Sequence, residues 1–175
     1  MDVLIDAYVR TNDSKWQYYF RLWHEGVKQK SGGSYLNDFV DDMEWICLTM
    51  IRLYENTRDA RYMETAQLLW DKIKAQWNNQ AGGGLAWRQS QPWSKNACSN
   101  GPAGIIAVRM YQLNGNKQEG LDWAKKIRSW QTEKLFDEQT GAVYDNINAK
   151  TGAITKWLFT YNQGTYLGMA HELYK

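Results

Sequence analysis

Hydrophobic side chains recur every three or four positions along most of this 175-residue chain. The repeat is clearest over residues 45–53 and 62–77, and such a period is typical of amphipathic helices. We therefore predict an all-α fold with helices near residues 2–10, 14–30, 41–56, 60–77, 100–114, 117–133 and 162–175.

The linkers between these predicted helices alternate in length. Residues 11–13, 57–59 and 114–116 form short turns, whereas 31–40, 78–99 and 134–161 are long and rich in Gly, Asn and Trp. This alternation indicates stacked helical hairpins that curve toward a toroid. The long loops then gather on one face, where function is usually carried.

Each short turn places an Asp or Asn five residues after a tyrosine, at Asp13, Asp59 and Asn116. Such a side chain can accept hydrogen bonds from the free N–H groups that begin the next helix. We therefore expect these three residues to cap the second helix of each hairpin.

Strand propensity is local. Residues 142–147 and 153–157, separated by 148–152, predict one small β-hairpin. Residues 85–87 follow three glycines and predict a short strand.

The aromatic composition is unusual, with 10 Trp and 11 Tyr beside only 4 Phe. Most rings therefore carry a polar group, which suits a surface that must offer an apolar face and a hydrogen-bonding edge together. Sugar-binding clefts need such surfaces. The alternative is that these rings fill wide gaps between helices.

Several functional classes are disfavoured. Lys+Arg 21 and Asp+Glu 19 leave a net charge of +2, which provides no strong field for nucleic acid. No apolar run approaches the roughly 18 residues of a membrane span. Two cysteines without metal-ligand spacing do not support a zinc site, and no cofactor is expected.

Three polar clusters lie where long loops enter predicted helices. Residues 38–45 contain Asp41 and Asp42; residues 95–100 contain an ammonium group and two amides, and residues 160–164 a tyrosine and two amides. If the hairpins stack, the clusters converge at one mouth. Each cluster also has a plainer interpretation, since Asp stabilises a first helical turn and Asn-rich loops often cap themselves.

Asp41 and Asp42 offer the strongest chemistry. Adjacent Cα atoms are about 3.8 Å apart, so the two carboxyl groups can lie about 5 Å apart, near the separation that retaining glycosidases use. Mutual repulsion would leave one ionised and one protonated. Histidine catalysis has little support: we expect structural roles for His24 and His171 and a buried thiol at Cys47.

Five blocks together resemble the endo-α-1,6-mannanases of glycoside hydrolase family 76: residues 41–45 (DDMEW), 82–87 (GGGLAW), 95–97 (KNA), 143–145 (VYD) and 160–164 (TYNQG). The resemblance implies that residues 1–175 are part of an (α/α)6 toroid that hydrolyses α-1,6-linked mannan with retention. It implies no metal. It also implies export, because the family acts on extracellular or cell-envelope glycans.

The resemblance assigns site residues as well. It implies that Asp41 is the nucleophile, Asp42 the acid/base and Asp145 a sugar contact. From the polar clusters and the aromatic residues nearby we add a hydroxyl-positioning set and two candidate stacking rings, namely Asn96, Asn100, Tyr161, Asn162, Gln163, Trp87 and Trp93.

Two features depart from the family. Its domains are about twice as long, so this chain supplies only part of the ring, and Pro102 is expected to be tolerated only in a first helical turn. An unclosed ring would expose apolar helix faces. We therefore expect the chain alone to bind or cleave mannan poorly unless a second copy or the missing region completes the ring. Rival hypotheses are a non-catalytic carbohydrate-binding fragment and a structural helical-repeat scaffold.

Overall fold

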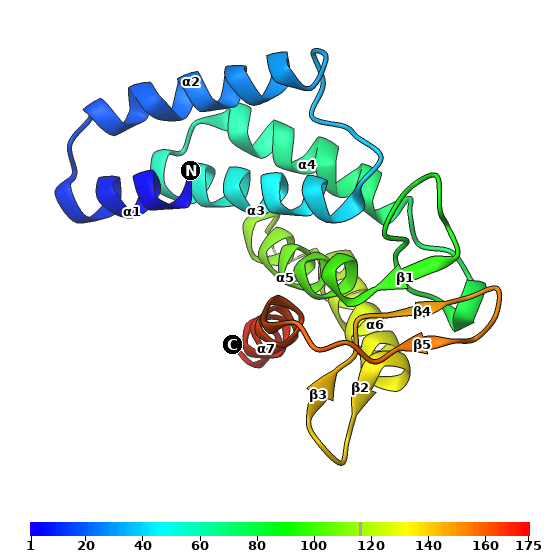
Figure 1. Cartoon of the computed structure of the whole chain (residues 1–175). Coiled ribbons are helices and arrows are strands. Elements are labelled where there is room, and N and C mark those ends of the chain that lie inside the picture. Colours follow the sequence, from blue (N-terminus) through cyan, green and yellow to red (C-terminus); the bar gives the residue numbers. More distant parts are fainter. Residues whose placement is uncertain (116) are drawn as a thin grey trace.

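The computed structural model describes residues 1–115 and 117–175, most of which are helical (Figure 1). The α-helices are α1 (Asp2–Thr11), α2 (Lys15–Lys30), α3 (Val40–Thr57), α4 (Ala60–Lys74), α5 (Ala97–Leu113), α6 (Gln118–Leu135) and α7 (Thr160–Tyr174). The all-α prediction is confirmed, and every predicted helix is present with small shifts at its ends.

Capping is confirmed at the second short turn, where the Asp59 carboxylate accepts a hydrogen bond from the Arg61 N–H at 3.1 Å and caps α4. At the first turn the N-cap residue of α2 is Ser14, and the Asp13 carboxylate, one residue earlier, accepts from the Lys15 N–H at 2.9 Å. The third predicted cap, Asn116, lies outside the described residues.

The strands are short and lie in two small sheets. β1 (Ser94–Asn96), β4 (Asn146–Asn148) and β5 (Ile154–Thr155) form an antiparallel sheet in the order β1-β4-β5, while β2 (Phe136–Asp137) pairs with β3 (Ala142–Val143). The predicted hairpin is confirmed for β4 and β5. Residues 142–143, assigned to the same hairpin, instead pair with β2.

Two local predictions between α4 and β1 are wrong. α4 ends at Lys74 rather than near residue 77, and Leu85 forms only an isolated bridge with Trp77 instead of a strand over 85–87. The bridge accounts for both differences. Trp77 pairs with Leu85, which follows the glycine-rich turn, and therefore cannot continue α4.

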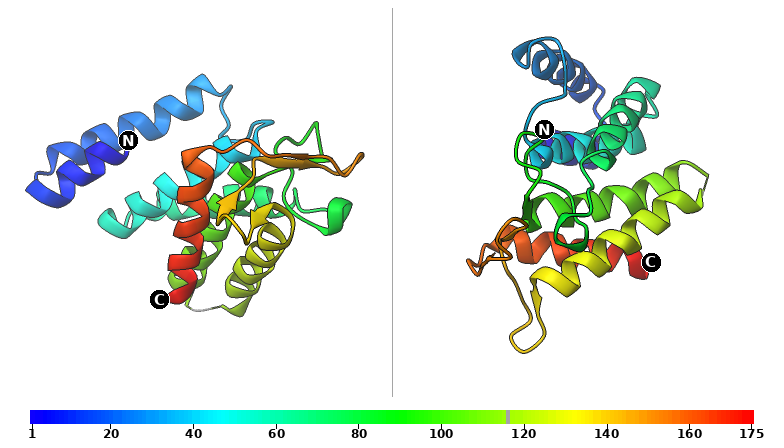
Figure 2. Two further views of the ribbon diagram at one scale, coloured as in Figure 1. Left: turned by 60° about the horizontal axis from the view of Figure 1, so that its bottom comes forward. Right: turned by 90° about the vertical axis from the view of Figure 1, so that its right-hand side faces the viewer.

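The helices stack as antiparallel hairpins, α3 against α4 and α5 against α6, with α7 packed on α5. The loops before α3 and β1 and the β1-β4-β5 sheet lie at the right of Figure 1, with the β2-β3 hairpin below them, and the right-hand view of Figure 2 looks onto this side. α3, α5 and α7 all begin there. The predicted separation of long loops from short turns is therefore confirmed.

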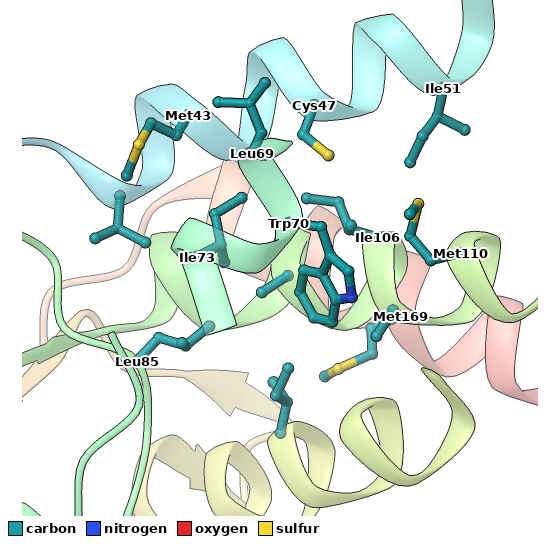
Figure 3. Close-up of a cluster of buried hydrophobic side chains, with 14 of the residues drawn as sticks. Met43, Cys47, Ile51, Leu69, Trp70, Ile73, Leu85, Ile106, Met110 and Met169 are labelled. Carbon is teal, nitrogen blue, oxygen red and sulfur yellow. The ribbon is translucent and has the colours of Figure 1, made fainter. Parts of the chain in front are cut away.

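The core lies between α3, α4 and α5 (Figure 3). α5 is buried along most of its length, and two glycines let α7 approach it closely. A Cβ at Gly101 would lie 2.5 Å from the Thr165 hydroxyl, and one at Gly104 would lie 2.1 Å from the Met169 sulfur. The predicted buried thiol of Cys47 is confirmed, at 0% exposure.

The expectation for Pro102 is wrong. α5 begins at Ala97, three residues earlier than predicted, so Pro102 lies inside the helix rather than in its first turn. Pro102 has no N–H to donate to the Cys98 carbonyl, which normally weakens a helix. Burial of the surrounding segment against α3 and α7 holds the helix in place.

Position 84 requires glycine for two reasons, the left-handed backbone conformation and the close approach of a neighbouring ring. Its φ is +84°, and a Cβ there would lie 2.6 Å from the Trp130 ring. We expect Gly84→Ala to lower the free energy of unfolding by about 3 kcal/mol, through left-handed strain and overpacking. Gly152→Ala, with φ +74° and open space around it, should cost only about 1 kcal/mol. Urea unfolding measures both, and equal losses would contradict the packing argument.

Candidate functional site

An open cleft of about 600 Å³ lies where α3, α5 and α7 begin. Its size is within the range of small-molecule sites. It is lined by Asp41, Trp45, Trp87, Ser94, Asn96, Cys98, Asp145, Asn146, Trp157, Phe159 and Tyr161. All three polar clusters contribute, so their predicted convergence is confirmed.

Asp41 is the acidic residue that α3 contributes to the cleft wall. It lies in the first turn and is half-buried. Burial raises the pKa of its carboxyl above the usual value, and the charge of Asp42 raises it further. The start of α3 is fixed beside the aromatic wall because the Val40 N–H donates to the Trp87 carbonyl at 2.9 Å.

Asp42 is placed differently. It also lies in the first turn of α3, but it is exposed and is not among the residues that line the cleft. Consecutive helical residues diverge by about 100°, which separates the two side chains. The expectation that both carboxylates face one hollow is therefore corrected: in this chain only Asp41 does. Both carboxylates still lie at the positive end of the helix dipole, where an Asp stabilises the first helical turn.

Asp145 is held as a fixed acceptor in the opposite wall. Its carboxylate accepts hydrogen bonds from the Asn146 amide at 2.8 Å and the Asn162 amide at 3.3 Å. Its carbonyl accepts from the Ala97 N–H at 2.8 Å, which ties β4 to the start of α5. Asn162 is fully buried and positions Asp145 instead of lining the cleft.

Asn96 and Asn100 have different positions. Asn96 lines the cleft, where its side-chain oxygen accepts from the Ser94 hydroxyl at 2.8 Å. Asn100 is buried beneath it and accepts from the Leu85 N–H at 2.9 Å, while its amide donates to the Asn96 carbonyl at 2.8 Å. These hydrogen bonds use the Asn100 side chain to fix the loop that contains Leu85, and Asn100 does not line the cleft.

Two further predicted contacts also lie outside the cleft lining. Gln163 bonds both the N–H and the carbonyl of Val143 at 2.8 Å, which attaches β3 to α7. The Trp93 ring is covered by the Lys150 ammonium, 3.3 Å from the ring centroid. The predicted residues that line the cleft are Asp41, Trp87, Asn96, Asp145 and Tyr161.

The aromatic wall is larger than the sequence indicated. Trp45, Trp157 and Phe159 also line the cleft, and the Phe159 ring stacks on Tyr161 with centroids 5.2 Å apart. Trp45 lies within the 38–45 cluster and Phe159 directly precedes the 160–164 cluster, so proximity to the clusters was an available signal. The same signal was available for Cys98, which lies within the 95–100 cluster, and for Ser94, which directly precedes it, while Asn146 directly follows Asp145.

Cys98 has the properties of a buried neutral thiol. It lines the cleft at 8% exposure. Burial raises the pKa of the thiol, and the neighbouring charge of Asp41 raises it further. A thiol kept protonated in this way is a poor nucleophile.

His24 is structural, as expected. It is buried, with its Nε2 3.2 Å from the Thr65 hydroxyl. In the described part of the chain, no group of three or more His, Cys, Asp or Glu could hold a metal ion. No described helix is long and apolar enough to cross a membrane.

Lys95 supports the site from below and does not face it. Its side chain is fully buried, and its ammonium donates to the Gly84 carbonyl at 2.6 Å. The ammonium group of the 95–100 cluster is therefore not available to a ligand in the cleft. Burial lowers the pKa of Lys95 to about 8.

Comparison with known proteins gives a consistent result. The sequence profile of glycosyl hydrolase family 76 matches residues 1–175. The α-1,6-mannanase GH76A of Salegentibacter sp. HEL1_6 is 45% identical, with a TM-score of 0.95 and a match covering 99% of this chain and 52% of that chain. An inactive variant of that enzyme, in which two consecutive aspartates are replaced by alanine, has been solved in complex with α-1,6-mannotetrose.

A second relative is longer still. The mannan endo-1,6-α-mannosidase DCW1 of Candida glabrata is 32% identical over 162 residues, a match covering 87% of this chain and 32% of that protein. The chain therefore spans about half the length of the solved relative and about a third of the curated one.

The depressed pKa of Lys95 predicts how stability changes with pH. Between about pH 8 and about pH 10.4 the unfolded chain holds a proton on Lys95 that the folded chain has released. The free energy of unfolding should therefore rise with pH in the wild type relative to Lys95→Met. Urea unfolding across this range measures the difference. For the control variant Lys28→Met, at an exposed position, the free energy of unfolding should change with pH as it does in the wild type. If Lys95→Met also followed the wild type over this pH range, the prediction would be refuted.

Proposed function

Because the chain belongs to glycosyl hydrolase family 76, we propose that it supplies the catalytic-motif half of a retaining hydrolase acting on α-1,6-linked mannan. The observation that carries the proposal is the cleft itself, where the starts of three helices bring Asp41, Asp145 and an aromatic wall together. A pyranose needs these partners, since it presents C–H faces to rings and hydroxyl edges to polar groups.

The reaction proceeds in two steps. Asp41 attacks the anomeric carbon of a mannosyl unit and forms a covalent ester, while Asp42 gives its proton to the departing oxygen. Asp42 then takes a proton from water, which attacks the same carbon and releases Asp41. No metal or cofactor takes part in this scheme.

Both the relatives and the chain's own sequence support this assignment of the aspartates. The inactive Salegentibacter variant is altered at two consecutive aspartates. Asp41 and Asp42 are the single pair of consecutive aspartates in this sequence. Asp41 also has the environment that a nucleophile requires, with one side against the cleft and the other against the protein interior.

The remaining cleft residues bind the sugar. Trp87, with Trp45 and Trp157, offers stacking faces, and Tyr161, Asn96 and Asp145 offer groups that can hydrogen-bond hydroxyls. Asn100, Asn162 and Gln163 support these residues from behind.

Asp42 limits what the chain can do alone. It is exposed at the rim, and the acid/base role requires substrate or another wall to bring the leaving oxygen beside it. The chain spans about half of its solved relative. We propose that the remaining half of the toroid, or a second copy of the chain, supplies that wall. A mannan substrate of the cell envelope or extracellular space implies an exported protein.

The position of Asp42 favours a second candidate function. With one aspartate in the cleft and the other outside it, the chain could bind α-1,6-mannan without cleaving it. The aromatic wall and Asp145 suffice for binding, whereas hydrolysis needs both carboxylates.

Replacing the nucleophile separates catalysis from folding. In a polypeptide continued to the full length of its relatives, Asp41→Asn should lower kcat on α-1,6-mannan by about a thousandfold or more, since an amide cannot form the ester. Release of reducing ends measures turnover, and thermal unfolding checks the fold. Asp122→Asn, at an exposed position on α6, should retain activity. Retained turnover in Asp41→Asn would remove Asp41 from the role.

Calorimetry with α-1,6-mannan oligosaccharides separates hydrolysis from binding. Hydrolysis predicts binding heat accompanied by new reducing ends, whereas binding alone predicts heat without them. Trp87→Ala should weaken the heat signal in both cases, because a stacking face is lost. Absence of heat and of reducing ends from the continued polypeptide would contradict both functions.

A further inference from the structure

Glu44 is a buried carboxyl group that the proposed reaction does not use. It lies three residues after Asp41 on α3, and helical residues at that spacing share a face. Its exposure is 0%, and neither of its carboxyl oxygens has a hydrogen-bond partner in the described parts of the chain. One oxygen of Asp41 is also buried without a partner.

The charge of Asp41, on the same helix, opposes a negative charge on Glu44. The neighbouring thiols of Cys47 on α3 and Cys98 on α5 bring no positive charge that would offset it. An unpaired carboxylate in such a place costs far more than a neutral acid. Burial, and after it the charge of Asp41, raises the pKa of Glu44 well above its usual value.

Asp41 is the better place for the single charge of this pair. It is half-buried and opens onto the cleft, whereas Glu44 has no access to solvent. It also lies in the first turn of α3, where the helix favours an anion.

We propose that Glu44 is a positioning residue for the nucleophile: its carboxyl holds a proton beneath Asp41, so that the two carboxyl groups carry one negative charge, located on Asp41. The term nucleophile rests on the proposed function; the protonation of Glu44 does not. If both groups were ionised, repulsion would favour protonation of Asp41, and a protonated Asp41 cannot attack the sugar.

Carboxyl titration by NMR of the chain labelled with ¹³C in Asp and Glu tests the proposal without substrate. In the wild type, the Glu44 carboxyl should keep its proton well above the pH at which an exposed glutamate releases it. Asp41→Asn should move its titration midpoint to lower pH, because the opposing charge is gone. Glu44→Gln should leave the ionisation of Asp41 in place, because a neutral group has been exchanged for another.

Two outcomes would overturn the proposal. A midpoint for Asp41 that falls in Glu44→Gln would show that Glu44 carries the charge. A Glu44 midpoint unmoved by Asp41→Asn would show burial alone, with no coupling to the nucleophile. The second measurement needs no variant at Glu44 and remains decisive if Glu44→Gln fails to fold.

Folding stability gives an independent measure. Above about pH 4.3 the unfolded chain releases the Glu44 proton that the folded chain keeps. The folding equilibrium constant of the wild type should therefore fall about tenfold per pH unit relative to Glu44→Gln, up to the midpoint of Glu44 in the folded protein. Glu138→Gln, in an exposed turn, should run parallel to the wild type. If the folding equilibrium constant of Glu44→Gln changed with pH as it does in the wild type, the proposal would also be overturned.

These tests fail separately from those of the proposed function. Retained turnover in Asp41→Asn would end the nucleophile assignment and leave the titrations unchanged. Titrations that show an ionised Glu44 would leave the loss of turnover in Asp41→Asn intact.

Discussion

The close approach of α5 and α7 is the constraint on which the site depends. Gly101 and Gly104 leave no room for a side chain against Thr165 and Met169, so the two helices can pack with their starting ends level. α3 packs on the other side of α5. Because these three helices begin on one side of the molecule, their first turns and the preceding loops must share the same space. The cleft follows from that packing.

A buried polar framework then fixes what the cleft presents. Lys95 holds the carbonyl of Gly84, and Asn100 holds both polar groups of Leu85. Asn162 holds Asp145 from behind. The Lys95 ammonium and both polar groups of the Asn100 side chain have partners within the protein, as buried polar groups generally do. At the cleft wall, one oxygen of the Asp41 carboxyl has no hydrogen-bond partner within the described residues.

Helix positions and the convergence of the polar clusters could be predicted because they follow from local periodicity and from the alternation of loop lengths. The division of labour within each cluster could not. Asn96 and Asn100 are chemically identical, and only the turn of α5 decides that Asn96 reaches the cleft while Asn100 lies beneath it. Asp42 was misplaced for the same reason: the sequence shows adjacency, whereas the direction of a side chain depends on where the helix begins.

The aromatic residues show a related difficulty. Trp87 and Trp93 belong to one loop and look equivalent in the sequence, but Trp93 is covered by Lys150, which comes from a distant segment. Glu44 was missed because a glutamate inside a helix resembles a solvated residue. Its burial depends on how α3 meets the rest of the molecule, which no local pattern records.

The sheet that joins β1 to β4 has a consequence for synthesis of the protein. Lys95 pairs with Ile147, so the ribosome releases β1 about fifty residues before its partner exists. During that interval the edge of β1 has no strand to meet, and the carbonyl of Asp145 that receives the Ala97 N–H is also absent. Contacts of this separation form slowly. The hairpin of α3 and α4 can assemble early during translation, whereas the wall of the cleft closes only after the last third of the chain has emerged.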